Sequence, residues 1–131
     1  MNTRLSLVLL AGVALTGCNS SDPSSDPIIP HDITITQGAA GKGPNAFSPA
    51  NFTFSLAVQT TVTWQNRDFS GSGPYGSTGV AHRLVSNDGT TFFSEAIPSN
   101  GIFVATLSAP GAYAYHCSIH PAMTGTVTVN P

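Results

Sequence analysis

From His31 onward, apolar side chains recur at every second position of the chain. Ile33 and Ile35 alternate with threonines, and Phe52 and Phe54 alternate with polar residues in the same way. A period of two is typical of strands with one buried face, whereas helices repeat every 3.6 residues. We therefore expect about eight short strands and no substantial helix. They are predicted at residues 32–36, 51–56, 61–65, 81–86, 91–96, 102–107, 112–117 and 126–130.

Short β-branched and aromatic strands, separated by glycines and prolines, indicate an antiparallel sandwich or barrel. The weakest candidates, 81–86 and 91–96, flank Asn87-Asp88-Gly89, which is a good hairpin turn. The 131 residues suffice for one such domain. The glycine- and serine-rich stretch Arg67–Val80 is predicted to be a surface loop.

The first 30 residues have a different character. Residues 1–17 combine Arg4 with an apolar stretch that is too short to span a bilayer, as in an export signal. They end in Leu15-Thr16-Gly17-Cys18, which resembles the bacterial lipoprotein signal and implies lipidation of Cys18. The alternative is an ordinary signal peptide with a stray cysteine. Residues 18–30 are predicted to be the lipidated cysteine and a flexible, proline-containing tether, followed by one domain at 31–131.

Few charges remain on the expected mature chain. Its basic side chains are Lys42, Arg67 and Arg83, against six acidic side chains. Nucleic-acid binding requires a basic surface, so this class of function is excluded. The membrane contact expected for this chain is the lipid anchor, on the periplasmic side of a bacterial membrane. Asn19 after the cysteine resembles the sorting pattern for the outer membrane.

The two cysteines have different predicted roles. If Cys18 carries lipid, Cys117 has no disulfide partner in an oxidising compartment. Cys117 is followed by His120 and Met123 in a C-x₂-H-x₂-M pattern. Thiolate, imidazole and thioether are ligands of redox-active copper, and a second imidazole would complete a His₂Cys site with a weak axial Met. From the residues alone, three histidines are candidates for this second imidazole ligand: His31, His82 and His116.

Over roughly residues 47–129 the sequence resembles the cupredoxin (type 1 blue copper) family, in particular amicyanin- and plastocyanin-like members. The resemblance runs through Val62–Asp68, His82, Gly111–Cys117 and Ser118–Val127. It implies a Greek-key β-sandwich that holds one type 1 copper. It also implies that Asn66 ties the two ligand loops together near the thiolate. The implied ligands are His82, Cys117, His120 and Met123.

One departure from the family pattern is the glycine-rich insertion that separates Asp68 from His82. His82 still leads into an alternating strand, as the family's first histidine does. His31 lies at the tether junction and is expected to be exposed. His116 points away from Cys117 by strand alternation.

The implied function is a membrane-tethered monomer that carries single electrons between redox proteins through Cu(I)/Cu(II). The electron is expected to pass through His120, within an apolar patch formed by Ile119, Pro121, Ala122, Pro44 and Ala46. The alternative is a copper-binding module that stores or delivers the metal without redox turnover. A Cys-His nucleophilic enzyme is disfavoured, because it leaves Met123 without a role and lacks a motif to orient the base. The remaining aromatics of note, Trp64, Tyr113 and Tyr115, are predicted to be core residues.

Overall fold

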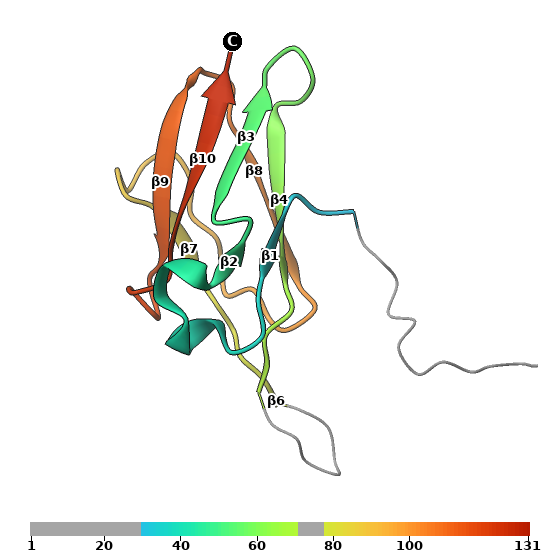
Figure 1. The fold of residues 1–131 in the computed structure, drawn as a ribbon, viewed down its shortest axis with the longest axis vertical. Helices are drawn as coiled ribbons and strands as arrows, with labels where there is room; N and C mark the ends of the chain where they lie inside the picture. The colour runs from blue at the N-terminus through green and yellow to red at the C-terminus, as the bar shows by residue number, and fades with distance from the viewer. Residues whose placement is uncertain (1–29, 71–77) are drawn as a thin grey trace, which may run out of the picture.

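The computed structural model describes residues 30–70 and 78–131, so the predicted signal peptide, Cys18 and all of the tether before Pro30 lie outside it. The described chain forms two four-stranded sheets, ordered β2-β1-β4-β8 and β3-β10-β9-β7, which pack face to face (Figure 1). A two-stranded ribbon, β5-β6, is separate from both. The strands are β1 (Ile33–Ile35), β2 (Phe47–Ser48), β3 (Asn51–Ser55), β4 (Thr61–Asn66), β5 (Phe69–Ser70), β6 (Thr78–Gly79), β7 (Leu84–Ser86), β8 (Ile102–Thr106), β9 (Gly111–Cys117) and β10 (Thr124–Asn130).

The all-β sandwich is confirmed, but its pairing is mixed rather than purely antiparallel. β1 pairs with β4 in parallel, with Ile33 opposite Trp64, and β10 pairs with β3 in parallel, with Val127 opposite Phe52. The other strand pairs are antiparallel. Alternation along one strand indicates which face is buried and says nothing about the direction of the neighbouring strand, so the sequence pattern could not distinguish these pairs.

Two of the predicted strands differ from those observed. Residues 91–96 form no strand and join the sheet through an isolated bridge between Val85 and Phe93, and β7 is shorter than 81–86. The prediction also missed β2, which is too short to show a period. Among residues 30–70 and 78–131 the helical segments are two short 3₁₀ turns, η1 (Ala39–Gly41) and η2 (Gly43–Asn45). In this described part, no helix is long and apolar enough to cross a membrane.

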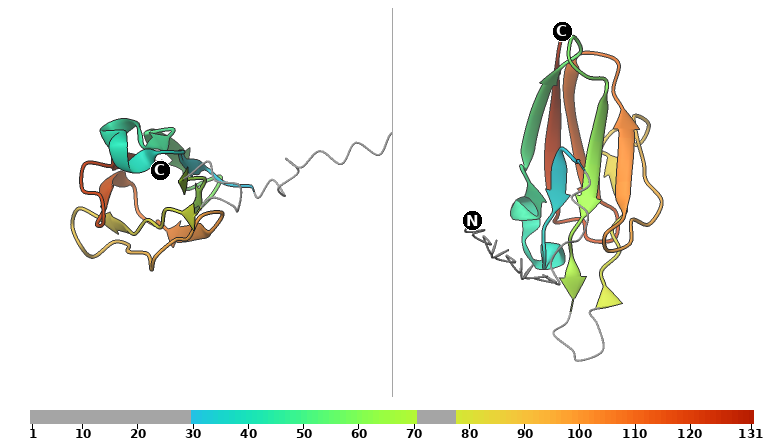
Figure 2. Two further views of the ribbon diagram at one scale, coloured as in Figure 1. Left: turned by 90° about the horizontal axis from the view of Figure 1, so that it is seen from below. Right: turned by 90° about the vertical axis from the view of Figure 1, so that its right-hand side faces the viewer.

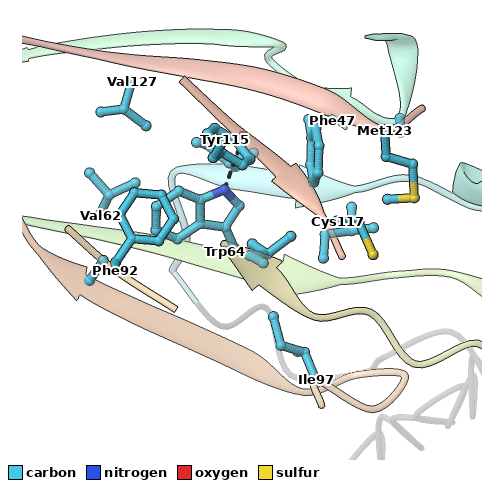
Figure 3. Close-up of a cluster of buried hydrophobic side chains, with 14 of the residues drawn as sticks. Phe47, Val62, Trp64, Phe92, Ile97, Tyr115, Cys117, Met123 and Val127 are labelled. Carbon is cyan, nitrogen blue, oxygen red and sulfur yellow. Dashed lines mark hydrogen bonds between the residues drawn. The ribbon is translucent and has the colours of Figure 1, made fainter. Parts of the chain in front are cut away.

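The core lies between the sheets and is rich in aromatic rings (Figure 3). Trp64 and Tyr115 are fully buried, as predicted, with ring centroids 5.5 Å apart in an edge-on arrangement. Tyr113 is only partly buried at the edge of this core, and its hydroxyl donates to the carbonyl of Ala109. Apolar burial on this scale is the main stabilising contribution to a sandwich of this size.

The chain brings several segments to one end of the sandwich. β9 ends there at Cys117, β10 begins there, and the turns η1 and η2 lie beside them (Figures 1 and 2). The β5-β6 ribbon projects from the same end, and it corrects the prediction for Arg67–Val80, because short strands pair where a loop was expected. β7 pairs with β9 so that Leu84 lies opposite Cys117, which places His82 near the end of β9.

Candidate metal centre

A tight turn between β9 and β10 carries Cys117, His120 and Met123. Three backbone hydrogen bonds close it: Cys117 N to Met123 O at 3.1 Å, His120 N to Cys117 O at 3.2 Å, and Met123 N to His120 O at 2.9 Å. The turn points the His120 ring back toward the end of the strand. Its Nδ1 lies 3.8 Å from Sγ of Cys117.

His82 reaches the same sulfur from a distant part of the sequence. Its backbone forms a two-way bridge with Ile97, with N–O distances of 3.1 and 2.7 Å, just before β7 begins. The pairing of β7 with β9 then brings Nδ1 of His82 to 3.7 Å from Sγ of Cys117. Both side chains are fully buried.

The side chains of His82, Cys117 and His120 form a group that can hold a metal ion, because their donor atoms all lie within 4.8 Å of one another. The two imidazole rings have centroids 5.1 Å apart and are inclined by 58°. His120 is only partly buried, so one of the three donors is near solvent. Two members of the group are therefore buried in the core, and the third ring lies near the surface.

Met123 belongs to the same end of the core. Its side chain is fully buried, and Figure 3 shows its sulfur at the same end of the cluster as the Cys117 sulfur. A thioether is a weak, soft donor, so a methionine in this place suits a distant fourth ligand.

The other two histidines lie elsewhere. His31 was expected to be exposed but is partly buried, because it packs beside β1 with its Nε2 2.8 Å from Oγ1 of Thr34. His116 is also partly buried, with its Nδ1 2.7 Å from Oδ1 of Asn87, whereas its neighbour Cys117 is fully buried. Neither histidine is part of the three-residue group.

Asn66 supports the segment that carries His82. Its amide donates to the carbonyls of Val80 at 2.7 Å and Ile97 at 2.9 Å, and its Oδ1 accepts from the N–H of Asp68. The segment that carries His82 is thereby tied to the end of β4. Two of these bonds reach the His82 segment and the third lies at the end of β4, and the predicted link of Asn66 to the Cys117 turn stays a prediction.

Asp68 is a site residue that the sequence reasoning did not identify. Its Oδ2 lies 3.0 Å from Nε2 of His82, and both groups are buried. The sequence offered one signal for it, because Asp68 stands at the start of the glycine-rich insertion that separates it from His82. The two residues are 14 positions apart, and only the folded chain shows that they meet.

The cysteine and the first histidine influence each other's protonation. Burial raises the pKa of the Cys117 thiol, but the contacts with His82, with backbone N–H groups and with His120 outweigh this and lower the pKa to about 6. Burial lowers the pKa of His82, and the contacts with Cys117 and Asp68 raise it above its usual value. These contacts therefore favour a thiolate, the form in which cysteine binds metals.

The donor set identifies the metal that these residues fit. Two imidazoles and one thiolate, with a buried thioether nearby, are the combination found in type 1 copper sites. His82, Cys117 and His120 thus fit one type 1 copper ion.

Comparisons with known proteins agree with this geometry. No family model and no curated protein matches the sequence. Among solved structures, a purple cupredoxin from Nitrosopumilus maritimus is 29% identical, with a TM-score of 0.61, over 77% of this chain and 100% of its own. The copper-containing nitrite reductase of Thermus scotoductus SA-01 is 24% identical, with a TM-score of 0.57, over 79% of this chain and 23% of its own. The Cu(I) form of an amicyanin mutant is 20% identical, with a TM-score of 0.51, over 79% of this chain and 87% of its own.

The β-sandwich and its His-Cys-His group therefore define a cupredoxin-like protein. The first of these neighbours aligns along its whole length with 77% of this chain. The other two are below 25% identity and bear on the fold alone.

Proposed function

We propose that this protein is a single-electron carrier in which His82, Cys117 and His120 hold one copper ion, with Met123 as the distant fourth ligand. The observation that carries the proposal is a buried thiol between two imidazole nitrogens at 3.7 and 3.8 Å. A copper ion bound there would supply the one-electron couple Cu(I)/Cu(II).

The surrounding residues suit this task because they hold the donors in place and keep water away. His82 and Cys117 have no exposed surface, and each is anchored by paired backbone. When the protein fixes the positions of the ligands, they move little as copper changes between its two oxidation states. Two hydrogen-bonded sheets hold the donors rigidly. Rigid donors favour fast electron transfer and slow the release of copper, so the site suits an electron carrier better than a protein that delivers copper.

His120 provides the route to a partner. It is the partly exposed member of the group, and Ile119 beside it is 51% exposed. Pro121, Ala122 and Pro44 are also exposed, and Gly43, which precedes Pro44, lies close to the backbone of Ala122. A small apolar surface of this kind suits brief encounters with redox proteins. Ala46 must be removed from the predicted patch, because it is fully buried below η2.

We further propose that the carrier is exported and lipid-anchored through Cys18, on the periplasmic side of the outer membrane, and that it is monomeric and not itself an enzyme. The lipobox-like Leu15–Cys18 and the polar tether support the anchor. The low charge and the small size of the apolar surface support a monomer.

The test is a spectroscopic and redox titration of the purified protein loaded with Cu(II). We expect an intense thiolate-to-copper absorption in the visible range and a reversible one-electron titration. Cys117→Ala should abolish the absorption, whereas His116→Ala, on the same strand but outside the group, should retain it. A colourless complex, or colour that survives Cys117→Ala, would contradict the proposal. Irreversible redox behaviour combined with ready copper transfer to an apo acceptor would favour copper delivery instead.

A further inference from the structure

A buried carboxylate lies behind His82, on the side of the ring away from the sulfur. Oδ2 of Asp68 is 3.0 Å from Nε2 of His82, while Nδ1 of the same ring faces Sγ of Cys117 at 3.7 Å. Asp68 is 1% exposed and His82 is 0% exposed. The two ring nitrogens of His82 thus face two different groups, and neither nitrogen faces water.

The carboxylate oxygens also accept backbone hydrogen bonds from the start of η1. Oδ1 accepts from the N–H of Gly38 at 2.7 Å, and Oδ2 accepts from the N–H of Ala39 at 3.1 Å. A group that receives donors at both oxygens acts as an acceptor, so the remaining contact with Nε2 requires a hydrogen on that nitrogen.

The backbone of Asp68 is held just as firmly. Its N–H donates to Oδ1 of Asn66 at 2.9 Å, and its carbonyl accepts from the N–H of Val80 and from the hydroxyl of Ser99, both at 3.1 Å. The carboxylate cannot swing away from His82 without breaking several of these bonds. Its position is therefore set before any metal binds.

We propose that Asp68 is a positioning residue for the copper site, which accepts the Nε2–H of His82 and thereby directs the lone pair of Nδ1 toward the metal position beside Cys117. This inference rests on the proposed function. Carboxylates that bind the second nitrogen of a metal-binding histidine fix its tautomer and increase its basicity. A more basic imidazole stabilises Cu(II) more than Cu(I), so Asp68 also lowers the reduction potential.

The first test compares Asp68→Asn with Asp32→Asn. Asp32 is a matched control, because its Oδ2 also accepts a backbone N–H, from Thr63 at 2.8 Å, and it is not in the metal group. We expect Asp68→Asn to weaken Cu(II) binding by about 10- to 100-fold and Cu(I) binding by less, so that the reduction potential rises. Asp32→Asn should leave both affinities and the potential unchanged. Equal behaviour of the two variants would overturn the proposal.

The second test needs no metal. In metal-free Cys117→Ala protein at about pH 9, where an imidazole is neutral, long-range ¹H–¹⁵N NMR reads the tautomer of His82. The proposal expects the hydrogen on Nε2 when Asp68 is present and a loss of this preference after Asp68→Asn. A hydrogen on Nδ1 in the protein that retains Asp68 would overturn the proposal, even if Asp68→Asn does not fold.

The two tests separate this inference from the proposed function. If the protein binds no copper, the electron-carrier proposal fails, while the tautomer measurement still decides the role of Asp68. If the protein cycles copper but Asp68→Asn behaves like Asp32→Asn, only the positioning role fails.

Discussion

The indole N–H of Trp64 on β4 donates to the hydroxyl of Tyr115 on β9 at 3.1 Å, although the two strands belong to different sheets. Both side chains are fully buried, and Figure 3 shows this bond in the middle of the core. Tyr115 is also two residues before Cys117 on the same strand, so both side chains lie on the inner face of β9. This pair therefore joins the two sheets beside the metal centre.

Removing the Tyr115 hydroxyl should destabilise the fold. Tyr115→Phe leaves the Trp64 N–H buried without an acceptor, which costs about 1–3 kcal/mol. Tyr113→Phe is the matched control, because the Tyr113 hydroxyl bonds to Ala109 at the surface and its loss should cost less, about 0.5–1.5 kcal/mol. Urea unfolding of the metal-free variants measures both. A larger loss for Tyr113→Phe would contradict the assignment of the Trp64–Tyr115 bond as the more important one.

The stability of the metal-free protein should fall in strong alkali. Burial raises the pKa of Tyr115 far above its usual value, while the hydrogen bond from Trp64 opposes this only in part. In the unfolded chain Tyr115 loses its proton near its ordinary pKa of about 10, whereas in the folded chain it keeps it. The unfolded state therefore binds fewer protons above about pH 10, and the free energy of unfolding decreases as the pH rises.

Urea unfolding over the range from about pH 8 to 12 checks this prediction. The decrease should be smaller in Tyr115→Phe, because that variant has no buried phenol to ionise on unfolding. Identical pH profiles for the two proteins would show that other groups cause the alkaline loss.

Gly125 on β10 should not tolerate a side chain. A Cβ at this position would lie 2.5 Å from the Tyr115 ring and hydroxyl, which is closer than real contacts allow. Gly125→Ala should cost about 1–3 kcal/mol, because the Tyr115 ring is fully enclosed and cannot move away. Gly111→Ala is the control, since its Cβ would lie 3.6 Å from Tyr113, an ordinary contact. Thermal unfolding compares the two, and equal melting temperatures would contradict the clash.

Asn66 should contribute more to stability than its single side chain suggests. Asn66→Ala removes two hydrogen bonds to the carbonyls beside His82 and one from the Asp68 N–H, all buried or partly buried. We expect a loss of about 2–4 kcal/mol, since buried groups are left unpaired. Gln59→Ala is the control, because its bond to the Thr61 carbonyl is exposed. A loss for Asn66→Ala no larger than for Gln59→Ala would show that these bonds contribute little.

The apolar surface around His120 should govern how fast two copper-loaded molecules exchange electrons. Ile119→Ser is expected to slow self-exchange by about tenfold, with the reduction potential unchanged, because it alters the contact surface and not the donors. Val58→Ser is the control, since Val58 is 82% exposed in the turn between β3 and β4, at the opposite end of the sandwich (Figure 1). NMR line broadening in mixtures of the two oxidation states gives the rates. Equal slowing by both variants would exclude this surface as the route.

The strand pattern of the sequence identified most of the sandwich and failed at particular places. Phe92 and Ser94 are buried and Phe93 and Glu95 are exposed, so the predicted strand 91–96 alternates up to Glu95. They still form only an isolated bridge, because they make no continuous ladder of hydrogen bonds with a neighbouring strand. The parallel pairs of β1 with β4 and of β3 with β10 involve strands far apart in sequence, which a local period cannot reveal.

The part of the metal centre that lies within the turn between β9 and β10 could be predicted from the order of the amino acids. Cys117, His120 and Met123 are spaced by three, and a tight turn of that length must bring its residues together. The second imidazole depends on the folded chain. His82 comes 35 residues earlier and reaches Cys117 only because β7 pairs with β9 in one register.

The contact between Asp68 and His82 likewise arises only in the folded chain. It exists because the N–H groups of Gly38 and Ala39, at the start of η1, donate to the Asp68 carboxylate and thereby hold it against the ring. Residue types and spacing indicate which donors a chain carries and which of them a short turn gathers. The register of strands that are distant in sequence decides which remaining donor completes the group and which carboxylate lies behind it.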